Sequence, residues 1–147
     1  MAALADRLRE DLNRSRKAQN KALTLVLGTV LSDIEYQRIL LKREVADDDV
    51  IDVLRKGIKR RRESVEAFDK GARPDLAAQE RGEIAALEPY LPASASDDDL
   101  RAAVKAAIAG GAATIGVVMG RVVPQFKGRA DGGTINRIAR EELGPSA

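Results

Sequence analysis

Apolar residues recur every three or four positions along most of the chain, which is the spacing of one face of an α-helix. Near the N-terminus, Leu4, Leu8, Leu12 and Ser15 share one face of a first predicted helix. The same spacing predicts a second helix over residues 21–43, after a short polar stretch. The pattern therefore indicates a chain that begins with two helices.

The next two apolar stripes predict a long helical hairpin. Asp47 is expected to cap a third helix, Gly71 to end it in the left-handed conformation, and Pro74 to occupy the first turn of a fourth helix. Because only a few residues connect the two helices, we expect them to lie antiparallel. A register centred on Gly71 places Arg61 opposite Glu80, which predicts a partly buried ion pair. The alternative is that both side chains extend to solvent at the edge of the bundle.

A connector rich in proline and serine follows the hairpin and marks a domain boundary. After it, Ser96 is expected to cap a fifth helix, residues 114–126 to form a sixth, and Asp131 to cap a last short helix. We therefore expect an all-α protein. Its expected domains are an N-terminal helical bundle with a long antiparallel helical hairpin, residues 1–92, and a small C-terminal three-helix bundle, residues 93–147.

Three large apolar residues, Ile39, Leu40 and Leu41, cluster at the end of the second predicted helix. They could form a dimer interface. Packing beneath the third helix is the simpler interpretation.

The composition removes most catalytic chemistries. The chain has 147 residues with neither Cys nor His, which excludes disulfides, thiol nucleophiles, imidazole catalysis and the usual zinc ligands. Gly116 and Gly120 are not followed by the Lys-Ser/Thr pair of a phosphate-binding loop. Two acidic triplets, residues 47–49 and 97–99, open predicted helices, so capping explains them better than metal binding. We expect no enzymatic activity, no cofactor and no metal site.

Membrane and export signals are also missing from the pattern. The longest uncharged run, residues 106–120, falls short of the roughly 20 apolar residues that span a bilayer. The first turns of the chain carry charges of both signs, unlike a secretory signal. We expect a cytoplasmic protein without a membrane partner.

Charge is distributed unevenly along the chain. Residues 1–100 carry 18 basic and 20 acidic side chains, whereas residues 101–147 carry 7 basic and 3 acidic ones. The loop at residues 127–133 is cationic and leads into a helix N-terminus, where backbone N–H groups can bind phosphate. A solvated turn before a capped helix is the alternative. Aromatic residues are only 3% of the chain, so any bound RNA would be recognised by backbone and shape.

Several strings in the sequence resemble the YqeY family over nearly the whole chain. That family is similar to the C-terminal region of the B subunit of the glutamyl/aspartyl-tRNA amidotransferase, and similar modules are appended to some glutaminyl-tRNA synthetases. The strings that carry the resemblance are Gly71 to Leu76, Lys59 to Ser64 with Phe68, Glu80 to Ile84, Tyr90-Leu91-Pro92, Met119-Gly120, Lys127-Gly128-Arg129-Ala130-Asp131-Gly132 and Asn136.

The resemblance implies an all-helical accessory RNA-binding module that contacts tRNA by backbone and shape. It does not imply amidotransferase catalysis, because the catalytic cradle of that subunit lies outside the shared region. Two cationic positions of the family are replaced here, by Val26 and Gly133. The candidate RNA-binding residues are Arg121, Lys127, Arg129 and Asn136, with Gly128 and Gly132 giving the loop its backbone freedom. The alternative is a protein–protein interaction module that docks a tRNA amidotransferase or an aminoacyl-tRNA synthetase without direct RNA contact.

Overall fold

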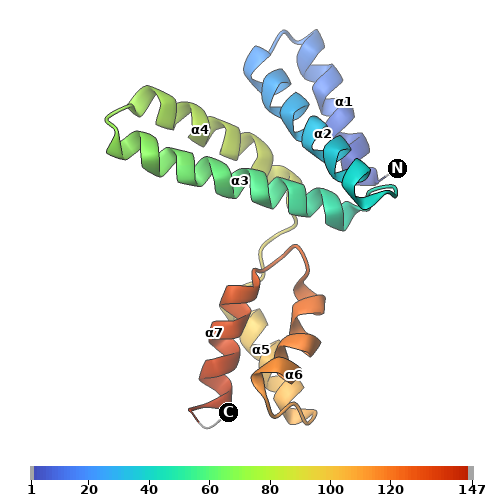
Figure 1. Ribbon diagram of the computed structural model, residues 1–147, viewed down its shortest axis with the longest axis vertical. Coiled ribbons are helices and arrows are strands. Elements are labelled where there is room, and N and C mark those ends of the chain that lie inside the picture. Colours follow the sequence, from blue (N-terminus) through green and yellow to red (C-terminus); the bar gives the residue numbers. More distant parts are fainter. Residues whose placement is uncertain (1, 146–147) are drawn as a thin grey trace. The chain divides into compact units, whose positions relative to one another are not determined.

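The computed structural model describes residues 2–145, and within them every regular element is helical (Figure 1). The all-α prediction is therefore confirmed. The chain divides into two compact units, one ending at Leu91 and the other beginning at Pro92. This division lies one residue before the expected domain boundary.

The first unit, hereafter the N-terminal unit, consists of two helical hairpins (Figure 1). Each of its four long helices contributes one fully buried leucine to a shared core: Leu8, Leu27, Leu54 and Leu87. Because the chain has few aromatic residues, aliphatic side chains fill this core. The elements are α1 (Ala3–Lys17), α2 (Lys21–Leu41), α3 (Asp47–Lys70), α4 (Pro74–Leu87) and a terminal 3₁₀ turn, η1 (Glu88–Tyr90).

The second unit, hereafter the C-terminal unit, is a bundle of three short helices (Figure 1). Ser96 Oγ accepts the Asp99 N–H at 3.0 Å and Asp131 Oδ1 accepts the Thr134 N–H at 2.8 Å, so both expected caps are confirmed. The sixth helix ends earlier than predicted, because Pro124 lacks an N–H donor and the last residues form a 3₁₀ turn. The elements are α5 (Asp97–Ala109), α6 (Ile115–Val122), η2 (Val123–Phe126) and α7 (Gly132–Leu143).

Asp47 does not cap its own helix as predicted. Its Oδ1 atom accepts the N–H of Leu4 at 3.0 Å, and this N–H is one of the donors that the first turn of α1 leaves without a helical partner. At the start of α3 the carboxylate of Asp49 accepts the Ala46 N–H at 2.8 Å instead. The aspartates at residues 47–49 therefore accept N–H groups at the start of both α1 and α3, and Asp47 joins the two helices.

The prediction of a left-handed Gly71 is also wrong. Gly71 has φ −84°, and the left-handed position belongs to Ala72, with φ 56°. The Arg73 N–H closes the turn on the Phe68 carbonyl at 2.9 Å. The helix runs one residue further than the glycine suggested, which places an alanine where glycine would be favoured.

The expected ion pair between Arg61 and Glu80 does not form within residues 2–145. Arg61 Nη1 donates to the Gly57 carbonyl at 3.1 Å. Burial and the charge of Glu80 raise the pKa of Glu83, and the charge of Arg61 partly opposes that rise. The charge of Arg61 therefore influences Glu83 rather than pairing with Glu80. The register of the hairpin differs from the predicted one because the turn occupies residues 71–73.

The hairpin of α3 and α4 is joined at its surface by two other ion pairs. Arg81 donates to Asp69 at 2.6 Å and Arg62 to Glu88 at 3.3 Å. All four side chains are largely exposed, so these pairs contribute little to stability. The apolar interface holds the hairpin together.

Candidate functional site

Arg121 was predicted to face RNA, and its side chain lies at the carboxyl end of α5. Its Nη1 atom donates to the Gly110 carbonyl at 3.1 Å and to the Ala107 carbonyl at 3.4 Å. A cation is favourable there because the last carbonyls of a helix carry partial negative charge. Arg121 therefore has a structural role as a cap of α5.

The 127–131 loop lies at the opposite end of α5. The Arg129 carbonyl accepts the Ala95 N–H at 2.9 Å, and Arg129 Nε donates to the Ala93 carbonyl at 3.4 Å. Both alanines precede the first residue of α5, a helix of 13 residues that is about 20 Å long. The structure therefore does not bring the side chain of Arg121 together with the loop, and the predicted RNA-binding residues do not form a single cluster.

The remaining predicted RNA-binding residues have varied surroundings. Lys127 is exposed. Gly128 has φ 78°, which confirms its need for backbone freedom, whereas Gly132 is the first residue of α7 and does not have a positive φ. Asn136 Oδ1 accepts Arg140 Nε at 2.7 Å, so its amide oxygen is already engaged.

The structural boundary changes the charge balance on which the RNA-binding prediction depended. From Pro92 onward the chain has seven basic and six acidic side chains. The larger surplus arose because a division at residue 100 assigned Asp97–Asp99 to the other unit. These aspartates open α5 at the end where the 127–131 loop lies. The end of the unit that carries the loop is therefore not a purely cationic surface.

Two cations of the C-terminal unit, Arg101 and Arg137, form ion pairs with several acidic side chains. Arg101 donates to Glu142 at 2.6 Å and to Glu141 at 2.7 Å, while Arg137 bonds Asp97 at 3.1 Å and Glu141 at 3.0 Å. These hydrogen bonds raise the pKa of Arg101 and lower that of Glu141. The network joins α5 to α7.

The N-terminal unit has an exposed apolar surface on α2. Leu25, Tyr36, Ile39 and Leu40 are 66%, 63%, 58% and 57% exposed. They fall on one side of the helix, because their spacings are close to whole numbers of 3.6-residue turns. We call these four residues the α2 apolar face.

The expectation that residues 39–41 pack beneath the third helix is wrong for two of them. Ile39 and Leu40 are exposed, and only Leu41 is half-buried against the core. The core side of α2 is already filled by residues such as Val30 and Ile34, and the apolar face points away from it.

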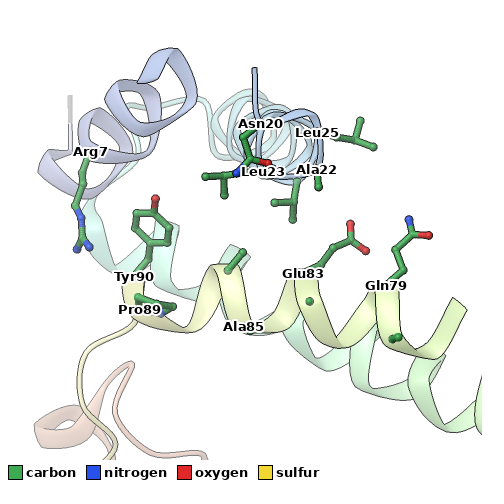
Figure 2. Close-up of a pocket in the computed structure, with 14 residues that line it drawn as sticks. Arg7, Asn20, Ala22, Leu23, Leu25, Gln79, Glu83, Ala85, Pro89 and Tyr90 are labelled. Atoms are coloured by element: carbon green, nitrogen blue, oxygen red, sulfur yellow. Dashed lines mark hydrogen bonds between the residues drawn. The ribbon is translucent and has the colours of Figure 1, made fainter. Parts of the chain in front are cut away.

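A groove lies between α2 and α4, with a volume of 630 Å³ (Figure 2). This volume is within the range of natural ligand pockets. We call it the α2–α4 groove. The α2 side is lined by Ala22, Leu23, Leu25 and Val26. The other side is lined by the small α4 residues Ala78, Gly82, Ala85 and Ala86, by Gln79 and Glu83 of the same helix, and by Pro89 of η1.

Two charged residues, Arg7 and Glu83, line the groove at different positions along α4. Arg7 lies near Tyr90 and Pro89, and Glu83 lies beside Gln79 toward the other end (Figure 2). The groove was not predicted, although the small residues Ala78, Gly82 and Ala85 recur on α4 at spacings of four and three. Residues at this spacing lie on one side of a helix, and small residues there allow another element to pack closely against it.

Tyr90 closes one end of the groove. Its hydroxyl donates to Asp11 Oδ2 at 2.5 Å, and the Arg7 guanidinium lies 4.7 Å from the centre of its ring. Burial and the bond to Asp11 raise the pKa of Tyr90 to about 12. Tyr90 therefore fastens η1, which follows α4, to α1 and has a structural role.

Residues 2–145 contain no group of three or more acidic side chains arranged to hold a metal ion. In that same part of the chain, no helix is both long and apolar enough to cross a membrane.

Fungal proteins are among the relatives of this chain. An uncharacterised protein of Schizosaccharomyces pombe is 39% identical over 90 residues, which is 61% of this chain and 73% of the relative. The "Altered inheritance of mitochondria protein 41, mitochondrial" of Pyrenophora tritici-repentis is 28% identical over 94% of this chain and 80% of its own length. The protein of the same name in Saccharomyces cerevisiae is 31% identical over 57% of this chain and 46% of its own length.

The names of these relatives correct the expected cytoplasmic location. Two of the three are named as mitochondrial proteins, which contradicts that prediction. The charged start of the chain argued only against a secretory signal and carried no information about other compartments.

The family assignment rests on a wider match. The model of the family described as Yqey-like protein matches residues 5–143, which includes both units of the structure. The chain therefore belongs to the family of YqeY-like proteins.

Proposed function

We propose that this chain is a non-catalytic adaptor that binds a protein partner through the α2 apolar face. The observation that carries the proposal is the presence of four large apolar side chains, each more than half exposed, on one side of a single helix. Three of them, Tyr36, Ile39 and Leu40, lie within about one helical turn of one another at the end of α2, and a contiguous exposed apolar patch is typical of an interaction site.

The α2 apolar face is not needed to complete the fold. The core of the N-terminal unit already contains a buried leucine from each long helix, and the four exposed residues are not among its buried members. Exposed apolar side chains of this size favour association, so a partner that covers them provides a physical reason for their presence.

The free energy available from this face is limited. Full burial of a large apolar side chain contributes about 1.5–3 kcal/mol. Four such residues contribute roughly 6–12 kcal/mol, and association itself costs about 4–15 kcal/mol. A stable complex therefore needs additional contacts on neighbouring surface.

The resemblance to the amidotransferase B subunit and to synthetase appendages suggests the class of partner. We propose a tRNA amidotransferase or an aminoacyl-tRNA synthetase. Binding of each purified enzyme is to be measured by calorimetry for the wild type and for an Ile39→Ser, Leu40→Ser double variant. The matched control is Val117→Ser, which removes an exposed apolar side chain from the C-terminal unit.

The double variant should lose at least tenfold in affinity, while the control should bind like the wild type. Equal binding by the double variant would exclude the α2 apolar face. Self-association of the wild type through this face, abolished by the same double variant, would assign it to a second copy of the chain and contradict the adaptor proposal.

RNA contact is a second candidate, supported by a different observation. The guanidinium groups of Arg121, Arg129 and Arg140 donate to uncharged oxygens, so these hydrogen bonds do not neutralise their charges. Binding of tRNA through two phosphate contacts should weaken about seven- to twelvefold when salt rises about fourfold. A Lys127→Ala, Arg129→Ala double variant should remove that salt dependence, and unchanged binding would exclude the loop.

A further inference from the structure

We propose that the α2–α4 groove binds one amphipathic helix of a protein partner, with an acidic side chain beside Arg7 and a basic side chain beside Glu83. This inference deepens the proposed adaptor function and rests on it. The groove and the α2 apolar face are adjacent surfaces that share Leu25.

The shape and lining of the groove fit an apolar helix face. The side formed by α4 and η1 runs from Ala78 to Tyr90, a length of about 18 Å, and the α2 side covers part of that length with residues 22–26. Its small side chains allow a third helix to approach closely, since the distance between packed helices depends on the side chains at the contact. Recognition of an amphipathic helix in a groove between helices is an established mode of peptide binding.

The two charges of the groove select the chemistry of the occupant. Arg7 contacts the face of the Tyr90 ring, and neither Arg7 nor Glu83 forms an ion pair with any residue from 2 to 145. Arg7 therefore has a charge available to a group outside this chain, and the charge of Arg61 only partly offsets the burial of Glu83 and its repulsion by Glu80. A helix with an acid at one end of its apolar stripe and a base at the other end is complementary to both.

The surroundings of Glu83 support a cationic ligand at that end. Burial raises the pKa of this carboxyl and the nearby charge of Glu80 raises it further, while the charge of Arg61 lowers it in part. A lysine or arginine of the occupant would stabilise the ionised carboxylate, which the free protein leaves without an ion pair.

Gly82 provides a way to block the groove without disturbing the fold. A Cβ atom at this position meets no atom within 4 Å, and glycine is itself unfavourable within a helix. A Gly82→Leu substitution therefore has room for its Cβ atom and places a larger side chain in the lining of the groove. Gly116→Leu is the matched control, because Gly116 also has open space and lies in the C-terminal unit.

The test uses synthetic helical peptides with one leucine stripe and three combinations of end charges: glutamate and lysine, two lysines, or two glutamates. Binding is measured by fluorescence polarisation with the full chain. The wild type should prefer the mixed peptide at least fivefold. Gly82→Leu should lose at least tenfold in affinity, and Gly116→Leu should leave affinity unchanged.

A charge exchange sharpens the test. A Glu83→Lys variant should bind the peptide with two glutamates at least fivefold more tightly than the mixed peptide. Thermal melting must show that each variant is folded. If Glu83→Lys is unfolded, Glu83→Gln serves instead, and it should lose the preference for the mixed peptide over the one with two glutamates.

Three outcomes would overturn the inference: no peptide binds the wild type, the Gly82→Leu variant binds as tightly as the wild type, or affinity does not depend on the end charges. Binding of a small apolar dye in place of the peptides would assign the groove to small molecules. One pair of results would separate the two proposals. If the Ile39→Ser, Leu40→Ser double variant loses enzyme binding but no peptide binds the wild type, the groove proposal fails while the adaptor function stands.

Discussion

The two units have almost the same charge balance but use their surfaces differently. The N-terminal unit has 18 basic and 17 acidic side chains, and the C-terminal unit has seven and six. The N-terminal unit has four large apolar side chains that are each more than half exposed. In the C-terminal unit the most exposed large apolar side chains among the described residues are Val117 and Val123, at 43% and 37%. The comparison teaches that exposed apolar surface, rather than net charge, distinguishes the two units.

The substitution with the largest expected effect tests whether the two units unfold independently. Leu54→Ala removes a fully buried side chain from the core of the N-terminal unit and should lower its stability by about 2–5 kcal/mol. Hydrogen exchange should show faster exchange in α1 to α4 and unchanged protection in α5 to α7. Loss of protection in both units together would show that they fold as one body.

Tyr90→Phe should have the next largest effect and should act on the N-terminal unit alone. It removes the hydrogen bond to the Asp11 carboxylate, which is worth about 1.5–3 kcal/mol for a charged partner. The raised pKa of Tyr90 makes a prediction for pH. The contribution of the un-ionised hydroxyl is fully present below pH 10 and is lost as pH rises toward about 12.

The pH effect is measured by urea unfolding across that range. Wild type should lose stability between pH 10 and about 12, and Tyr90→Phe should lose less. Tyr36→Phe is the control, because Tyr36 is exposed. Equal slopes for wild type and Tyr90→Phe would contradict the account of this contact.

Arg101→Gln tests the ion-pair network of the C-terminal unit. The hydrogen bonds of Arg101 and Arg137 lower the pKa of Glu141 from its ordinary value of 4.5. The contribution of Glu141 to stability is therefore present above pH 4.5 and is lost as pH falls below it. The variant should lower the melting temperature at neutral pH and flatten its dependence on pH, as measured by calorimetry. An unchanged acid transition would show that the network does not stabilise the unit.

The smallest effect is a gain in stability at the turn between α3 and α4. Ala72→Gly relieves an alanine with φ 56° and should stabilise the N-terminal unit by about 1 kcal/mol in chemical unfolding. Ala18→Gly is the matched control, since Ala18 ends α1 with φ −78° and should gain nothing. A loss of stability in Ala72→Gly would contradict the turn geometry.

The sequence predicted the helices well because local signals determine them. Apolar periodicity marked the helices, and Ser96 and Asp131 could be recognised as caps from side-chain chemistry alone. Pro74 marked the first turn of α4 for the same reason. These features depend on residues within a few positions of one another.

The predictions that failed depended on the arrangement of helices in space. Asp47 bonds Leu4, which is distant in sequence, and no local pattern indicates that contact. The partner of Arg61 depended on the register of the hairpin, which the left-handed Ala72 helps to set. A shift of a few residues in that register was enough to remove the expected ion pair.

The candidate site was predicted least well, because charge was counted along the chain rather than by structural unit. Asp97–Asp99 belong with the cations they were separated from, and Arg121 and Arg129 lie near opposite ends of α5. The exposed position of Ile39 and Leu40 could not be inferred from their hydrophobicity. Whether an apolar residue is buried depends on which helix packs over it.

Methyl NMR of the full chain with a purified partner enzyme tests the central claim most directly, because it reports on both units at once. Addition of the enzyme should shift the methyl signals of Leu25, Ile39 and Leu40 and leave those of Val117 and Val123 in place. Shifts confined to the two valines, with the α2 apolar face unchanged, would contradict the assignment of binding to the N-terminal unit.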